Sequence, residues 1–228
     1  MRQLKSRVLA LVQTDDLPAA LNALAQWPPR QVVNPLIGLL YHSEARVRWH
    51  AVAALGQVVA RLADEEIEAA RVVMRRLMWS LNDESGGIGW GAPEAMAEIM
   101  ANHERLACEY ACILVSYLNP DGNFLEHHGL QQGVLWGLGR LAQAHPDLVT
   151  EAAPFIRPYL ASPDETLRGL AAWAAVRMRR PALNAPLQAL RDDPARTTIF
   201  EQGRLMEHTI GELAAAQPND PCKQGEGP

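Results

Sequence analysis

The sequence contains few aromatic residues and no long hydrophobic run. Phe, Trp and Tyr make up 6% of the 228 residues, whereas hydrophobic residues as a class make up 48%. Because alanine is abundant at helical spacings and no stretch alternates at period two, we predict helices rather than sheets. No stretch approaches the ~18 apolar residues of a membrane-spanning helix, and no apolar signal segment follows Met1. We therefore expect a cytoplasmic protein without a membrane span.

Cysteine and lysine are also scarce. The cysteines are Cys108, Cys112 and Cys222. Their odd number and spacing argue against a disulfide framework, and no Cys/His pair completes zinc-finger spacing. We interpret Cys108 and Cys112, which are four residues apart on one helix face, as small buried residues. The only lysines are Lys5 and Lys223, and the formal net charge is -5. The chain as a whole therefore carries no basic field that would recruit nucleic acid.

One stretch of sequence recurs. Residues 43–56 read SEARVRWHAVAALG, and residues 162–174 read SPDETLRGLAAWA. In each stretch, Ser, Asp or Glu precedes an apolar–Arg pair, and small residues then recur at helical spacing. Small residues leave an apolar face flat enough for a second helix to approach closely. Self-similarity of this kind is typical of a solenoid.

The recurring residues resemble HEAT repeats of the short bacterial type found in phycobilisome (PBS) lyases. The residues that carry the resemblance are Val47, Arg48, Ala51, Ala54, Leu55 and Gly56 in the first copy, and Leu167, Arg168, Ala171 and Ala174 in the second. The resemblance implies an all-α fold, an α-solenoid of about five helical pairs. It also implies that Arg48 and Arg168 bond acidic caps of neighbouring repeats.

We expect one HEAT-like repeat domain over 1–216 and a disordered tail over 217–228, which has no apolar stripe. The expected units are capping helices at 1–29 and helical pairs at 30–62, 64–102, 103–144, 147–180 and 182–216. Within them we predict helices at about 124–144, at about 148–159 and at about 199–216. The second helices open at Val47, Ile88, Leu125, Leu167 and Ile199, although Leu130 fits the pattern as well as Leu125 does.

The second helices of such a stack line its concave side, and several residues at their N-terminal ends are suited to binding. These residues are Trp49, His50, Trp90, Glu126, His127, His128 and Glu201. If the repeat is aligned on Leu130 instead of Leu125, His127 and His128 fall in the loop that precedes the helix. We predict that this set contacts a partner.

The stretch 82–94, which begins with the Gly-rich loop 82–91, is the strongest functional candidate, because glycines let backbone approach a partner closely and the loop leads into a helix N-terminus. Its candidate residues are Asp83, Glu84, Gly86, Gly87, Gly89 and Trp90. It is not a Walker loop, since no Lys follows the glycines and a helix precedes them. Pro93 suits the first turn of the helix that follows.

We therefore predict a binding scaffold without a cofactor, which holds a protein or peptide through its concave face and loop 82–91. No nucleophile, base and orienting group recur at useful spacing, so the sequence favours binding over catalysis.

Three alternatives remain open. The lyase resemblance implies a small-molecule or tetrapyrrole role, with loop 82–91 and the two histidines as ligands. A HEAT-like di-iron hydroxylase suggests a metal site from His50, Glu126, His127 and His128, but this chain lacks that family's set of His–Glu pairs. HEAT-like DNA glycosylases suggest a set of Arg48, Trp49, Asp83 and Trp90, against which the acidic composition argues.

Overall fold

The computed structural model describes residues 2–81 and 89–216. The α-helices are α1 (Arg2–Val12), α2 (Leu17–Ala25), α3 (Pro29–Leu39), α4 (Ala45–Glu65), α5 (Ile67–Leu81), α6 (Ala92–Asn102), α7 (Glu104–Ser116), α8 (His128–Ala144), α9 (Ala153–Ile156), α10 (Glu165–Met178), α11 (Pro181–Ala189) and α12 (Ile210–Ala215). Two 3-10 helices, η1 (Pro146–Ala152) and η2 (Arg157–Ala161), flank α9, and two strands, β1 (Arg196–Glu201) and β2 (Arg204–Thr209), precede α12.

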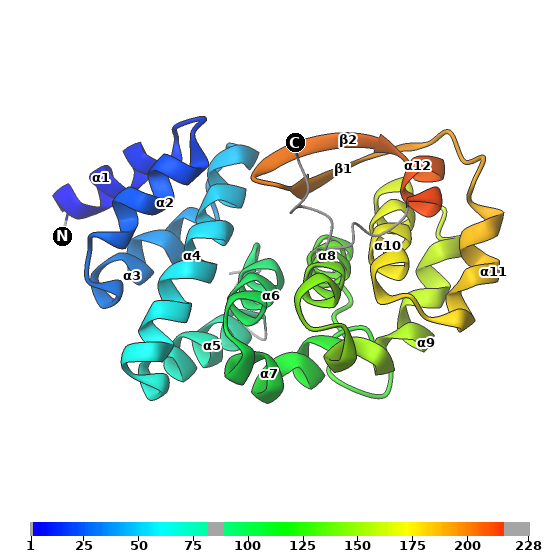
Figure 1. Ribbon diagram of the computed structural model, residues 1–228, viewed down its shortest axis with the longest axis horizontal. Coiled ribbons are helices and arrows are strands. Elements are labelled where there is room, and N and C mark those ends of the chain that lie inside the picture. Colours follow the sequence, from blue (N-terminus) through cyan, green and yellow to red (C-terminus); the bar gives the residue numbers. More distant parts are fainter. Residues whose placement is uncertain (1, 82–88, 217–228) are drawn as a thin grey trace, which may run out of the picture.

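The helices form an arc with an inner and an outer layer (Figure 1). Helices α4, α6, α8 and α10 pack side by side as the inner layer, and α3, α5 and α7 pack behind them. The apolar faces of both layers form one continuous core. An all-α solenoid is therefore confirmed, because each helix buries its apolar face against its neighbours in the stack.

The arginine of the recurring apolar–Arg pair makes the same backbone contact near the start of its helix in both copies. Arg48 donates from a terminal nitrogen to the carbonyl of His42 at 2.8 Å, and Arg168 donates to that of Ser162 at 2.6 Å. Arg168 also pairs with Asp193 at 2.7 Å, which lowers the pKa of that carboxyl. The expectation that Arg48 bonds an acidic cap of a neighbouring repeat is therefore wrong, since it binds backbone oxygens.

The helix predicted over 199–216 is wrong in its first half. Residues 196–209 form an antiparallel hairpin in which Glu201 pairs with Arg204, and only the last turns are helical, as α12. The turn residues Gln202 and Gly203 have φ of 52° and 77°, as a tight hairpin turn requires. The β-branched run Thr197, Thr198 and Ile199 favours a strand, and this signal should have outweighed the helical spacing.

Two further boundaries differ from prediction. The helix predicted from 124 begins at His128, which selects Leu130 as the repeat position. The helix predicted over 148–159 is divided into η1, α9 and η2, because Pro154 and Pro158 interrupt helical hydrogen bonding. Helix α6 begins at Ala92, as the helical pattern and Pro93 predict, and it follows Gly91 at φ 74°. Ile88 lies outside the described residues.

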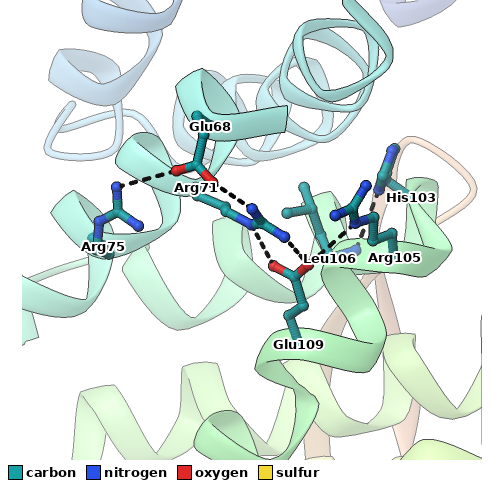
Figure 2. A network of polar contacts seen from close by, with 7 residues as sticks. All are labelled: Glu68, Arg71, Arg75, His103, Arg105, Leu106 and Glu109. Atoms are coloured by element: carbon teal, nitrogen blue, oxygen red, sulfur yellow. Dashed lines mark hydrogen bonds and ion pairs between the residues drawn. The ribbon is translucent and has the colours of Figure 1, made fainter. Parts of the chain in front are cut away.

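On the outer layer, charged side chains join α5 to α7 (Figure 2). Arg71 donates from Nε to Glu109 at 2.7 Å and also pairs with Glu68, while Arg105 donates to Glu109 at 3.3 Å. These contacts raise the pKa of Arg71 and lower that of Glu109. Because opposite charges satisfy one another here, the network ties the two helices together. Contrary to expectation, Cys108 and Cys112 on α7 are exposed.

Candidate binding site on the concave face

The hairpin crosses the concave side of the arc, from α10 and α12 towards α4 (Figure 1). Phe200 stacks on Trp49 of α4, with ring centroids 4.9 Å apart and planes 13° apart. The indole of Trp136 on α8 donates to the Phe200 carbonyl at 2.9 Å, and that of Trp173 on α10 donates to Glu201 at 2.8 Å. Three inner helices thus hold the hairpin, so the concave face is not an open groove.

Two cavities lie along this face. We call the first the aromatic cavity, because it lies at the N-terminal ends of the inner helices and Tyr41, Trp49, Trp90 and Trp136 line it together with Arg48 and Glu94. Its volume is about 770 Å³, and Thr198 and Leu205 of the hairpin form part of its wall. This volume is within the range of sites for small ligands, ~300–1,000 Å³.

We call the second the arginine cavity. It lies further along the same helices, has a volume of about 1000 Å³, and is lined by Leu17, Glu98, Arg140, Arg177, Arg179 and Glu201. Arg140 pairs with Glu98 at 2.7 Å, and Arg177 pairs with Glu201 at 3.0 Å while its guanidinium lies 4.1 Å from the Trp173 ring centroid. Burial lowers the pKa of Arg177 to about 10. Both carboxylates of this cavity are therefore already paired.

Glu94, on the first turn of α6, is different. Its Oε2 atom has almost no accessible surface and no hydrogen-bond partner among the described residues. The carboxylate packs against Gly133 of α8 so closely that a Cβ there would lie 2.5 Å from Oε2. Burial raises the pKa of Glu94 to about 7, although its own backbone N–H and the charge of Arg48 act to lower it. Because its carboxyl group is desolvated and lies in the wall of a cavity, Glu94 is a candidate ligand-binding residue.

Trp90 forms the outer wall of the aromatic cavity. It is 39% exposed, and its ring meets that of His127 edge to face with centroids 4.9 Å apart. The imidazole Nδ1 of His127 accepts from the Gly129 N–H at 3.1 Å and so caps α8. Gly129 is required for this arrangement, because a Cβ there would lie 2.4 Å from the Trp90 ring. His127 therefore positions Trp90.

The structure brings together some of the residues predicted from sequence and separates others. Trp49 and Trp90 share the aromatic cavity. Glu201 lies in the hairpin and is held by Trp173 and Arg177. His50 is buried at 2% exposure, and its Nδ1 lies 2.9 Å from the Val12 carbonyl oxygen. The prediction that His50 faces a partner is therefore wrong, because its ring packs into the core beside α1.

Glu126 and His128 are exposed at the start of α8, outside the residues that line either cavity. Gly89 lies against the end of α5, where a Cβ would approach the Ser80 carbonyl oxygen to 2.7 Å. Asp83, Glu84, Gly86 and Gly87 are outside the described residues, so their proposed role remains a prediction.

Within residues 2–81 and 89–216, no three His, Cys, Asp or Glu side chains gather as metal ligands. In particular, His50 is engaged with α1 and does not join His127 and His128. No helix in the same ranges is long and apolar enough to span a bilayer.

Sequence reasoning did not select Glu94 or Trp136 as site residues, although the candidate stretch extends to Glu94. Glu94 is the third residue of α6, a position where an acid is ordinarily explained by the helix dipole. Glu94 can be recognised as a candidate only when it is considered together with Gly133 of α8. Glu94 supplies the carboxylate, and the missing side chain of Gly133 leaves the space that the carboxylate occupies. Trp136 was missed because its indole N–H is satisfied by the unpredicted hairpin.

We compared the chain with known proteins. No family model matches it. An uncharacterized protein of Archaeoglobus fulgidus is 33% identical over 120 residues, which are 52% of this chain and 56% of that protein. The chain thus spans little more than half the length of the curated relative it matches.

Solved structures match over most of the chain. An engineered protein has a TM-score of 0.52 at 16% identity and covers 94% of both chains. A designed armadillo repeat protein has a TM-score of 0.50 at 17% identity, over 91% of this chain and 95% of that one. The fold is an armadillo/HEAT-like α-solenoid. At these identities the likeness concerns the fold alone.

Proposed function

We propose that the protein is a non-catalytic binding scaffold that holds a protein or peptide partner in the aromatic cavity. The observation that carries this proposal is the cavity itself, since Trp49, Trp90 and Trp136 line a space of about 770 Å³ between the hairpin and the inner helices. Buried aromatic side chains supply much of the energy of protein interfaces. The N-terminal capping unit, the repeat boundaries and loop 82–91 keep their proposed roles in this scaffold.

A peptide suits this cavity because its rim is aromatic and accessible. Tyr41 is 47% exposed and Trp90 is 39% exposed. A partner could therefore lay its main chain across the rim and insert one side chain, without displacing the hairpin. The lyase resemblance remains a prediction from the repeat motif, with no observation in the structure that favours a tetrapyrrole.

The test is selection of binders from a random peptide library, followed by affinity measurement on purified variants. Trp90→Ala should weaken the selected peptides at least about tenfold, as expected for loss of an aromatic anchor. Trp79→Ala is the matched control, because Trp79 is 80% exposed on α5 and lines neither cavity. Equal affinity of the two variants would refute the proposed site.

One observation favours a second candidate, a nucleic-acid enzyme. Arg48, Trp49 and Trp90 do share one cavity, and Glu94 supplies a carboxylate there in place of Asp83. Aromatic rings and an acid could hold an extruded cationic base. Binding to duplex DNA with a steep salt dependence that Arg48→Ala reduces would support this candidate; no retention at low salt would exclude it.

A further inference from the structure

The aromatic cavity contains one polar group whose requirements the fold does not meet. Glu94 Oε2 is buried without a hydrogen-bond donor among the described residues. An unsatisfied buried acceptor is costly in a native protein, and each such group calls for an explanation. In the arginine cavity, by contrast, Arg140 and Arg177 supply donors to Glu98 and Glu201. Arg177 Nε is also buried without a partner among the described residues, but the carboxylates of the arginine cavity have their donors, whereas that of Glu94 lacks one at Oε2.

Space for the carboxylate is built into the packing. Gly133 is the residue of α8 that faces Glu94, and a Cβ at this position would lie within 2.8 Å of both carboxylate oxygens. Any other residue at 133 would displace the acid. The carboxylate is thus held at the cavity wall, between the inner helices and beside Trp49, Trp90 and Trp136.

The nearest cation does not satisfy Glu94. Arg48 lies in the same cavity and its charge acts on Glu94, but one of its terminal nitrogens donates to the carbonyls of His42 and Ser43. No hydrogen bond joins the Arg48 and Glu94 side chains among the described residues. His42 also lines the cavity, and its Nδ1 accepts from the Glu44 N–H at 3.1 Å. A molecule bound in the aromatic cavity can therefore supply the donor that Oε2 lacks among the described residues.

We propose that the aromatic cavity recognises a basic side chain of the peptide partner, with arginine preferred over lysine, and that Glu94 pairs with its guanidinium. This inference rests on the proposed function, since it names the residue that the binding site selects. A guanidinium is planar, donates to carboxylates through parallel N–H groups and stacks on aromatic faces. Indole rings attract cations, so the rings and the acid of this cavity favour the same ligand.

The length of the side chain also fits the site. Trp90 and Tyr41 are at the accessible rim, whereas Oε2 is buried at the inner wall. A long side chain spans this depth with its apolar stem against the rings and its charged end at the acid. A bare ammonium ion would lack the stem, and an acidic peptide would meet Glu94 with like charge.

The experiment uses the full chain and three tripeptides, acetyl-Gly-Arg-Gly-amide and its lysine and citrulline counterparts. Citrulline keeps the shape of arginine but carries no charge. Binding is followed by NMR through the indole N–H signals, where Trp49, Trp90 and Trp136 report the cavity and exposed Trp79 is the internal reference. The arginine peptide should bind at least about tenfold more tightly than the citrulline peptide.

Glu94→Gln is the decisive variant, because glutamine keeps the shape of the acid and removes its charge. It should lower affinity for the arginine peptide at least about tenfold, while the spectrum shows that the variant is folded. Equal affinity for arginine and citrulline peptides, or no change in Glu94→Gln, overturns the inference. If uncharged peptides from the library still require Trp90, the proposed function survives alone; if no peptide shifts the cavity signals, both fail.

Discussion

The two cavities of the concave face are formed by the same inner helices and the same hairpin, yet their charges are arranged differently. In the arginine cavity, Glu98 and Glu201 accept hydrogen bonds from arginines. In the aromatic cavity, Glu94 Oε2 has no partner among the described residues, and burial raises its pKa to about 7. The paired charges hold the hairpin and the inner helices together, whereas the role proposed for the unpaired acid is to bind a ligand.

Two glycines of α8, Gly139 and Gly133, pack closely against side chains of neighbouring helices, but in different ways. Gly139 lies beside Trp173, whose ring is fixed by its hydrogen bond to Glu201. Gly133 lies beside the Glu94 carboxylate, the end of a flexible side chain. The first contact is rigid and the second can give way. Substitutions at these two glycines should therefore differ in their effect on stability and on binding.

The largest effect is expected for Gly139→Ala. Its Cβ would lie 2.2 Å from the Trp173 ring and 3.1 Å from the Ala174 Cα, so backbone or indole has to move. We expect a loss of about 3 kcal/mol in the free energy of unfolding, measured with urea. Gly38→Ala is the control, because no atom lies within 4 Å of its Cβ; it should leave stability unchanged or raise it by up to ~1 kcal/mol. Similar losses in both variants would contradict the rigid contact.

Glu94→Gln should change how stability depends on pH. The folded pKa of about 7 is above the ordinary value of 4.5, so between these pH values the folded state binds more protons than the unfolded state. Stability of the wild type therefore falls as pH rises through this window. The variant lacks this loss, and at pH 8 its unfolding free energy should exceed that of the wild type by up to about 3 kcal/mol.

Urea unfolding of Glu94→Gln and wild type at pH 4.5 and pH 8 measures this difference. Glu98→Gln is the comparison from the arginine cavity, and should lose stability at pH 8 because it weakens the pair with Arg140 at 2.7 Å. If both variants shift in the same direction, the distinction between the two cavities fails.

Glu201→Gln should cost about 1.5 kcal/mol, since it keeps the acceptor for the Trp173 indole but removes the charge beside Arg177. Thermal and urea unfolding measure the loss. Glu207→Gln, in the next strand, removes a more exposed partner of Arg196 and should cost less than ~0.5 kcal/mol. A cost for Glu201→Gln as small as that of Glu207→Gln would show that the hairpin does not depend on its pairing to α10.

Gly133→Ala should have only a small effect on stability, below ~1 kcal/mol, because the Glu94 carboxylate can turn away from the new methyl group. Its effect should appear in binding, as a several-fold loss of affinity for the arginine tripeptide in the NMR titration. Unchanged affinity would mean that the position of the carboxylate does not matter.

Much of the fold could be predicted from the sequence, because the repeated pattern at Val47 and Leu167 specifies inner helices that bury small residues against their neighbours. The hairpin could not be predicted by that pattern. Ile199 satisfies the helical spacing, and only its β-branched neighbours and the Gln202–Gly203 turn distinguish a strand. Local periodicity was outweighed here by contacts with Trp49, Trp136 and Trp173, which are distant in sequence.

The candidate site was predicted in part for a similar reason. Trp49 and Trp90 were recognised because aromatic residues at the N-terminal ends of inner helices stand out in the sequence. Glu94 was not, since its significance depends on burial and on Gly133 in another helix. His50 was misassigned because the repeat pattern does not show that the ring turns towards Val12.

The most direct test of the account is titration of the Glu94 side-chain carboxyl by NMR on protein carrying carbon-13-labelled glutamate, with Glu94→Gln to assign the signal. The account predicts a midpoint of about 7 in the free protein, which falls by at least about one pH unit when acetyl-Gly-Arg-Gly-amide is bound, because the guanidinium stabilises the ionised acid. A midpoint near the ordinary 4.5, or one that the arginine peptide leaves unchanged, would contradict it.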